Sequence, residues 1–117
     1  MYVNCPIQEN NLSIGTIVTY DSNSGYWISA VNMNSVVGCI TREAHQDENG
    51  AWWVQVTFTG ECHALAAQSI PREGGFMMVS NGRVYANPTE SGCGIISPAI
   101  PQQLERPEGA LVMVSLR

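Results

Sequence analysis

Short runs of alternating apolar and polar residues, separated by turn residues, constrain the fold of this chain most strongly. Residues 54–58 and 112–116 alternate with a period of two, as half-buried β-strands do. Further short runs rich in β-branched or aromatic residues lie at 16–20, 26–30, 36–41, 76–79 and 83–86. Helix signals are limited to 64–68, which could form one turn or a short helix. The sequence therefore predicts an all-β fold.

The same features recur in the same order in the two parts of the chain. Residues 15–30 and 75–86 each contain a glycine, a strand, an Asn/Ser/Gly turn and a second strand ending in alanine. A glycine-containing apolar run and a Gly-Ala pair before the last strand then recur, at 37–40 and 93–96 and at 50–51 and 109–110. The shared order and spacing predict two related halves, 15–58 and 75–116. Two such units would form a small pseudo-twofold β-barrel or sandwich of short antiparallel strands with few exposed edges.

The length of 117 residues suits one domain, which we place at residues 13–117. Residues 1–12 and 97–108 contain several prolines, many amides and isolated apolar side chains. We expect both segments to be extended arms along a partner, with 1–12 as an N-terminal arm. The N-terminus has neither the basic nor the apolar region of a signal peptide, and no apolar run approaches about 20 residues. We therefore expect a soluble protein made in a cytosol.

The charge of the chain limits its partners. It contains no lysine, five arginines and ten acidic residues, which gives a formal net charge of −5. Charged residues make up 13% of the chain, compared with roughly 25% in ordinary globular domains. Binding to phosphate backbones or anionic lipids needs a concentration of basic residues. We therefore expect neither nucleic acid nor a membrane as a partner.

Four cysteines lie far apart, at Cys5, Cys39, Cys62 and Cys93. In a reducing cytosol we expect them to be free and buried, although three disulfide pairings remain possible from the sequence. Three of these cysteines and His63 could in principle bind zinc, but the close Cys-x₂₋₄-Cys spacing of structural zinc sites is missing. The acidic loop at 43–48 also lacks the spacing of a calcium-binding EF-hand. The sequence predicts no metal and no cofactor.

Cys62 and His63 are the one adjacent pair with the composition of a nucleophile and a base. Neighbours on a strand point to opposite faces, so these two side chains cannot readily bond to each other. His45 could act as the base instead, but it lies in a polar loop. We expect no catalytic residues, and a small cysteine enzyme that uses Cys62 is the less favoured alternative.

Aromatic and isolated apolar residues are the candidates for partner binding. Of two adjacent tryptophans on a strand, such as Trp52 and Trp53, one faces the core and the other faces outwards. Tyr26 and Trp27 present the same alternation. Outward-facing tryptophans are typical of interfaces. The residues that we expect to contact a partner are Tyr2, Ile7, Leu12, Tyr26, Trp27, Trp52, Trp53, Ile100 and Leu104.

The order of these motifs resembles that of small β domains in virion proteins of tailed bacteriophages. The likeness covers residues 15–117 and consists of a Gly-x-strand-Ser-x-x-Gly hairpin, a Gly-Ile strand and the C-terminal Gly-Ala-Leu-Val-Met-Val-Ser-Leu-Arg. In many such domains Asp follows the glycine that opens the hairpin, whereas Thr16 and Phe76 occupy those positions here. Such domains occur as capsid decoration (cement) proteins and in tail or fibre components.

The resemblance implies a structural virion protein without enzymatic activity, located on the capsid exterior. Such a protein binds the major capsid protein and stabilises the capsid, often as a trimer. The alternative within the same resemblance is a tail, baseplate or fibre adaptor that binds carbohydrate through Trp27, Trp52 or Trp53.

Overall fold

The computed structural model describes residues 2–32, 37–70, 77–86, 96–97 and 107–116. All regular elements in these residues are β-strands: β1 (Tyr2–Ile7), β2 (Ile17–Asp21), β3 (Tyr26–Ser29), β4 (Val37–Ile40), β5 (His45–Gln46), β6 (Trp52–Thr57), β7 (Gly60–Leu65), β8 (Met77–Ser80), β9 (Arg83–Ala86), β10 (Ile96–Ser97) and β11 (Leu111–Leu116). Every ladder between them is antiparallel. The all-β prediction is therefore confirmed. The short helix considered at 64–68 is wrong, because its first two residues end β7.

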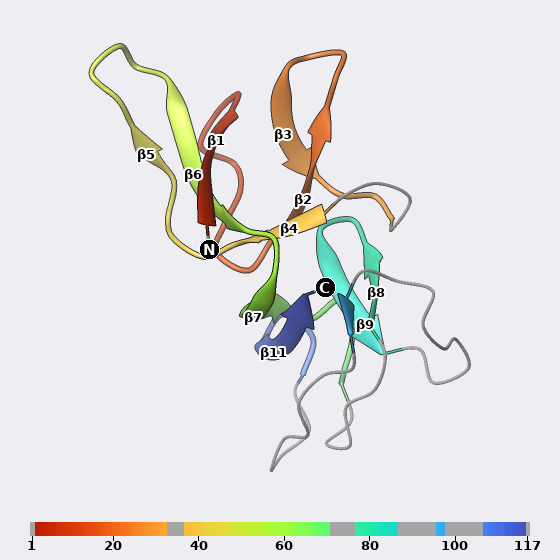
Figure 1. Cartoon of the computed structure of the whole chain (residues 1–117). Coiled ribbons are helices and arrows are strands. Elements are labelled where there is room, and N and C mark those ends of the chain that lie inside the picture. The colour runs from red at the N-terminus through yellow and green to blue at the C-terminus, as the bar shows by residue number, and fades with distance from the viewer. Residues whose placement is uncertain (1, 33–36, 71–76, 87–95, 98–106, 117) are drawn as a thin grey trace.

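The first sheet has the strand order β1-β6-β4-β2-β3, and β5 also pairs with β6. It occupies the upper part of Figure 1. The sheet curls, so that Cα atoms of its edge strands β1 and β3 come within 8 Å of each other. No ladder joins these two strands, so the sheet stays open. Of the two predicted architectures, the fold is the sandwich-like one and not a closed barrel.

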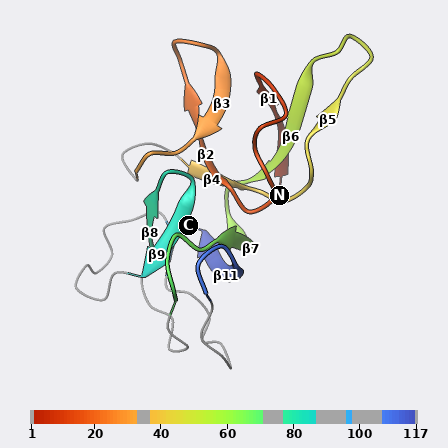
Figure 2. The same cartoon turned by 180° about the vertical axis from the view of Figure 1, so that it is seen from behind.

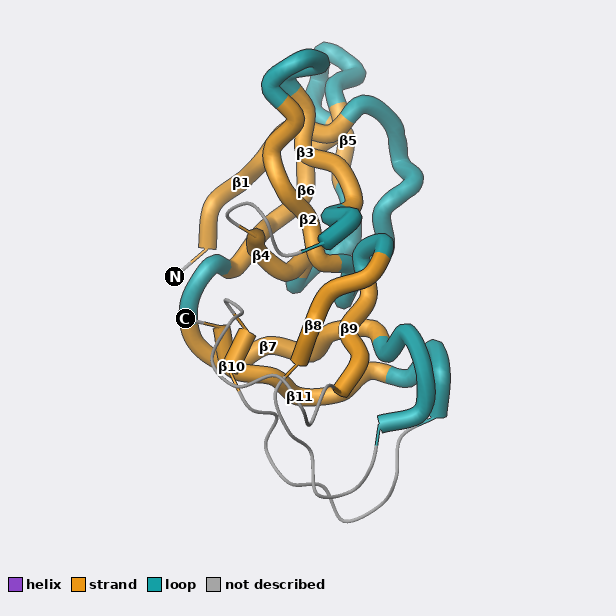
Figure 3. Tube along the Cα trace, turned by 90° about the vertical axis from the view of Figure 1, so that its right-hand side faces the viewer, coloured by secondary structure: helices purple, strands orange, loops and turns teal. Residues whose placement is uncertain are grey.

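The remaining strands form the sheet β10-β11-β7 and the separate hairpin β8–β9. Both lie below the first sheet when the molecule is seen from the front and from behind (Figures 1 and 2). We call β1–β6 the first half of the structure and β7–β11 the second half. The tip of the hairpin contacts the first half through backbone hydrogen bonds. Gly82 N donates to Ala30 O at 2.7 Å, and Ile17 N donates to Gly82 O at 2.8 Å. These hydrogen bonds connect the hairpin to the first sheet, which lies above it in Figure 3.

Two hydrophobic cores lie on opposite sides of β2 and β4. Because side chains alternate along a strand, Ile17 and Cys39 face one core while Val18 and Ile40 face the other. This alternation explains why every residue of β4 is buried. The first core contains Cys5, Ile7, Val18, Ile40, Val54 and Val56. The second core contains Ile17, Ala30, Val37, Cys39, Cys62, Ala64, Ala66, Ile70, Met77, Val79, Val84, Val112, Val114 and Leu116.

The last long strand of each half has a similar set of neighbours. β6 lies between β1 on one side and β4 on the other, and β11 lies between β7 and β10. The prediction of two related halves, 15–58 and 75–116, stays a prediction. The arrangement would give β1 and β7 equivalent positions, so that each repeat would begin one strand earlier than the sequence indicates.

The expected N-terminal arm at 1–12 is corrected by the structure. Tyr2–Ile7 forms β1, which pairs with β6 in a six-residue register. Cys5 is buried, and Ile7 is only 1% exposed. The alternating Val3, Cys5 and Ile7 side chains are a strand pattern, and Pro6 is tolerated because an edge strand needs no N–H on its outer side. Most of the second expected arm lies outside the described residues.

Candidate functional site

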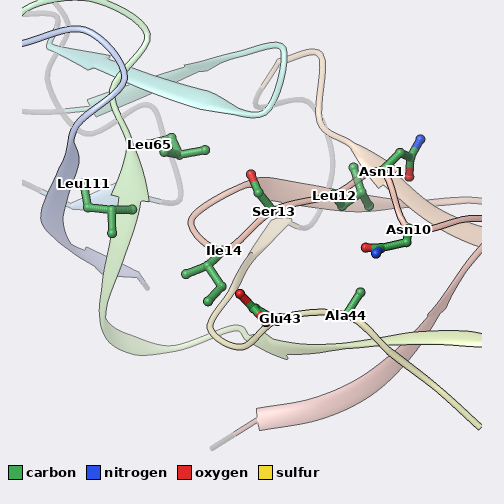
Figure 4. Close-up of a pocket in the computed structure, with 9 residues that line it drawn as sticks. All are labelled: Asn10, Asn11, Leu12, Ser13, Ile14, Glu43, Ala44, Leu65 and Leu111. Carbon is green, nitrogen blue, oxygen red and sulfur yellow. The ribbon is translucent and has the colours of Figure 1, made fainter.

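An open groove of about 640 Å³ lies where the two halves meet. Two loops of the first half form its sides, namely 10–14 between β1 and β2 and 43–44 between β4 and β5. Leu65 from β7 and Leu111 from β11 lie at one end of it (Figure 4). The groove is therefore built by both halves together and exists only in the folded domain.

Gly15 shapes the end of the groove where the two halves touch. Its φ of +90° is a left-handed conformation that favours glycine. A Cβ at this position would lie 2.6 Å from Leu111 Cδ2 and 3.1 Å from Leu65 Cγ. The loop is held by two backbone bonds, from Gly15 N to Ile40 O and from Leu65 N to Gly15 O, both 2.9 Å long. The absence of a side chain thus lets the loop pass close to both leucines.

The groove has apolar walls and a polar rim. Leu12, Ile14, Ala44 and Leu65 are half-buried, and Leu111 is 42% exposed. The rim consists of the exposed side chains of Asn10, Asn11, Ser13 and Glu43. A neighbouring cavity of about 530 Å³ shares Ile14 and Glu43 with the groove and adds Thr41, Arg42, His45 and Gln55. Apolar walls beside amide and hydroxyl groups can receive an extended peptide, because its side chains and its backbone both find partners.

The residues that the sequence proposed for partner binding do not lie together in the structure. Leu12 lines the groove, while Tyr2 and Tyr26 are exposed elsewhere on the surface. Ile7 was proposed as a contact residue and this is wrong, because its side chain belongs to the first core. Ile100 and Leu104 lie outside the described residues.

Trp52 and Trp53 point to opposite faces of β6, as expected for neighbours on a strand. Trp52 packs against the first core. The Trp53 indole donates from Nε1 to Asp47 Oδ2 at 3.0 Å. The other oxygen, Asp47 Oδ1, accepts the backbone N–H groups of Asn49 and Ala51, each at 2.9 Å. These hydrogen bonds, with that of Trp53 foremost, lower the pKa of Asp47. Asp47 therefore links the outward-facing indole of Trp53, through hydrogen bonds, to the turn between β5 and β6.

Trp27 belongs to an aromatic cluster at the edge of the first core. Its ring packs edge-on against Phe58, with 5.3 Å between the ring centroids. The centroid of the Tyr20 ring lies 5.8 Å from that of Trp27. Phe58 in turn lies over Gly38, where a Cβ would come within 2.9 Å of the ring. Trp27 is thus half-buried among its own chain's residues, and Tyr20 is the exposed member of the cluster.

Cys5, Cys39 and Cys62 are free and buried, as expected, and Cys93 lies outside the described residues. Cys62 faces the second core while its neighbour His63 is exposed. The Cys39 thiol donates to His63 O at 3.4 Å. Interaction with the Cys62 side chain, and burial, raise the pKa of Cys39, and the same interaction lowers the pKa of Cys62. Cys62 is therefore partnered by a second thiol.

Sequence reasoning missed the groove residues Ile14, Leu65 and Leu111. Each lies in or beside an ordinary apolar run, and no local pattern shows that the side chain remains accessible. Their exposure follows from how the two halves meet. Gly15, the glycine before the first hairpin, was a partial signal of the groove in the sequence, since a side chain at this position would collide with Leu65 and Leu111.

In the part of the chain that the structure describes, no group of three or more His, Cys, Asp or Glu side chains is placed to hold a metal ion. The same residues include no helix with the length and apolarity needed to cross a membrane.

The fold and the groove together define an all-β domain with an apolar groove at the junction of its two halves. Comparison with models of known protein families, with curated proteins and with solved structures found no match.

Proposed function

We propose that this protein is a structural component of a bacteriophage virion that binds the major capsid protein on the outer surface of the capsid and stabilises the shell. The observation that carries the proposal is the apolar groove, in which Leu111 remains 42% exposed. Contiguous apolar surface with a polar rim is typical of protein-binding sites. The sequence resemblance to phage virion domains supplies the class of partner.

In this proposal an extended segment of a coat subunit lies along the groove. Its apolar side chains would cover Leu12, Ile14 and Leu111, while the rim groups Asn11 and Ser13 would bond to its backbone. Binding that spans neighbouring coat subunits stabilises the assembled shell, because the subunits cannot separate without losing this contact. The net charge of −5 agrees with a place outside the shell, since it disfavours binding to packaged DNA.

Contacts between copies of the chain are part of the same proposal. Tyr26 and Ile28 are exposed on one face of β3, and Val31, two residues after the end of this strand, is 66% exposed. This surface is separate from the groove residues and is available for association of copies, for which the resemblance implies a trimer.

The two alternatives receive less support from the contacts described. A tail, baseplate or fibre adaptor that binds sugar would need an accessible indole, whereas Trp27 and Trp52 pack against the first core and the Trp53 N–H bonds to Asp47. A cysteine enzyme would need a base beside Cys62, whereas Cys62 pairs with Cys39.

The test compares two exposed apolar residues, one inside and one outside the groove. Leu111→Ser should reduce binding to purified capsids at least about tenfold in co-sedimentation, which corresponds to about 1.4 kcal/mol. Val3→Ser on β1 is the matched control, because Val3 is 48% exposed and lies outside both the groove and the β3 surface, and it should bind the capsid like the unmodified protein. Both variants should keep the thermal transition of the parent within a few degrees, since neither side chain is buried.

The stoichiometry in particles provides an independent check. Quantitative mass spectrometry of purified virions should find this chain in a fixed ratio to the major coat subunit. A copy number far below that of the coat would favour the tail or fibre alternative. Full capsid binding by Leu111→Ser, or absence of the chain from particles, would contradict the proposal.

A further inference from the structure

The junction between the halves also contains two buried thiols, on strands that approach each other. Cys39 is on β4 of the first sheet and Cys62 is on β7 of the second, and Cα atoms of these strands come within 8 Å. Both side chains belong to the second core. The Cys39 thiol donates to the backbone oxygen of His63, the residue after Cys62, at 3.4 Å, and interaction with the Cys62 side chain raises the pKa of Cys39. The fold thus brings together two sulfurs from strands of different sheets.

We propose that Cys39 and Cys62 are an oxidisable pair that forms a disulfide when the folded protein meets hydrogen peroxide. The bond would join the two halves covalently. The inference rests on the interaction between the two thiols and does not depend on the proposed function. Cys5 is not a competing partner, since it lies in the first core on the other side of β4.

The two cysteines have different roles in the reaction. Cys62 is 5% exposed and Cys39 is fully buried, so Cys62 is the sulfur that a small oxidant reaches first. Interaction with Cys39 also lowers the pKa of Cys62 and so favours its thiolate, which is the reactive form. Cys62 is therefore the attacking residue and Cys39 the resolving residue.

The reaction balances with one peroxide molecule for each pair. The Cys62 thiolate attacks one oxygen of hydrogen peroxide and the O–O bond breaks. The departing hydroxide takes up the proton that the Cys62 thiol had released, which gives water and a sulfenic acid on Cys62. Cys39 sulfur then attacks Cys62 sulfur, the S–O bond breaks, and the hydroxyl leaves with the Cys39 proton as a second water. Two thiols are oxidised and the peroxide is reduced to water.

The disulfide should stabilise the fold. It would close the chain between residues 39 and 62 and so restrict the unfolded state, while it fixes β4 against β7 in the folded state. For a loop of this size in a domain of this length, we expect Tm to rise by about 10 °C. A thiol reductant should reverse the shift.

The experiment uses the full-length reduced protein, treated with hydrogen peroxide under native conditions and then denatured with an alkylating agent. We expect a product that has lost the mass of two hydrogen atoms and takes up two fewer alkyl groups. Trypsin cuts after Arg42 and separates Cys39 from Cys62, so the bond should appear as a cross-linked peptide pair. Because Cys5 is on the same tryptic peptide as Cys39, the assignment is repeated in Cys5→Ser, which should still form the link.

Two single variants test the separate roles. In Cys39→Ser, peroxide should leave a sulfenic acid on Cys62 that dimedone traps. In Cys62→Ser, Cys39 should remain unmodified under the same conditions. Folded parent protein that keeps all its thiols, over-oxidises Cys62 without a link, or joins other cysteines would overturn the proposal. The test for disulfide formation needs only the parent protein, so the proposal can be refuted even if a variant fails to fold.

Discussion

Replacing Gly38 by alanine should destabilise the first sheet, even though the change adds only one methyl group. Gly38 lies on β4, whose residues are all buried, and it faces β6. An added Cβ would lie 2.4 Å from Val56 Cγ1 and 2.9 Å from two atoms of the Phe58 ring. The φ of Gly38 is not in the left-handed region, so backbone strain plays no part. The effect of this substitution is therefore one of packing.

The size of the effect follows from the distances. Carbon atoms in contact lie about 3.5 Å apart, so Val56 and the new methyl group must separate by about 1 Å. Neither strand can retreat freely, because β4 pairs with both β2 and β6 and has a core on each side. Overpacking of this kind costs about 1–3 kcal/mol, and the smaller entropy of the unfolded alanine chain offsets about 0.4–1 kcal/mol. We expect a net loss of about 1 kcal/mol.

Urea unfolding of Gly38→Ala, followed by tryptophan fluorescence, measures this loss as a lower midpoint at an unchanged slope. Val56→Ala removes the methyl group that the new Cβ at position 38 would strike, and by itself should cost about 2 kcal/mol. The double variant should be less destabilised than the sum of the two single variants by about 1 kcal/mol, since the clash is relieved. A strictly additive double variant, or a Gly38→Ala protein as stable as the parent, would refute the packing argument.

Three other predictions follow from the contacts of β1, Asp47 and Gly82. Deletion of residues 1–7 should lower the free energy of unfolding in urea by at least about 3 kcal/mol, because β1 contributes the buried Ile7. An unchanged urea midpoint would show that the segment is an arm and not part of the sheet. Because hydrogen bonds lower the pKa of Asp47 in the folded state, its carboxylate should stabilise the turn above the ordinary pKa of 3.8 and lose this effect as pH falls through the lowered value. The fluorescence of Trp53 should follow this change, and Asp47→Asn should remove the acid-dependent step. Gly82→Ala should cost about 1–3 kcal/mol in thermal unfolding, since Gly82 has a φ of +81° and an added Cβ would meet a Thr16 carbon at 3.0 Å; equal stability would show that the hairpin tip is not tightly docked.

The local pattern predicted most of the strands correctly, because alternation and turn residues act over a few neighbouring positions. The runs at 54–58 and 112–116 coincide with β6 and β11, and the Asn81-Gly82 turn joins β8 to β9. The opposite orientations of Cys62 and His63 also followed from strand geometry alone. The N-terminal segment was misread because its proline and amides outweighed the period of two at Cys5 and Ile7.

The groove was only partly predictable, because exposure depends on which elements cover a side chain. Leu12 was proposed from the sequence and lines the groove, but Leu65 and Leu111 resembled ordinary strand residues. They line the groove because the second half meets the 10–14 loop at Gly15. The tryptophans were expected to contact a partner, yet Asp47 and Phe58 already contact two of them.

The sequence by itself determined that this chain is all-β, approximately where most strands lie, and which side chains share a face, since these properties depend on spacing along the chain. Only the tertiary structure decided that β4 is buried on both faces, that Cys39 and Cys62 share one core, and that a groove crosses the junction of the halves. These features require residues distant in sequence to meet, and their meeting depends on how two curved sheets pack together.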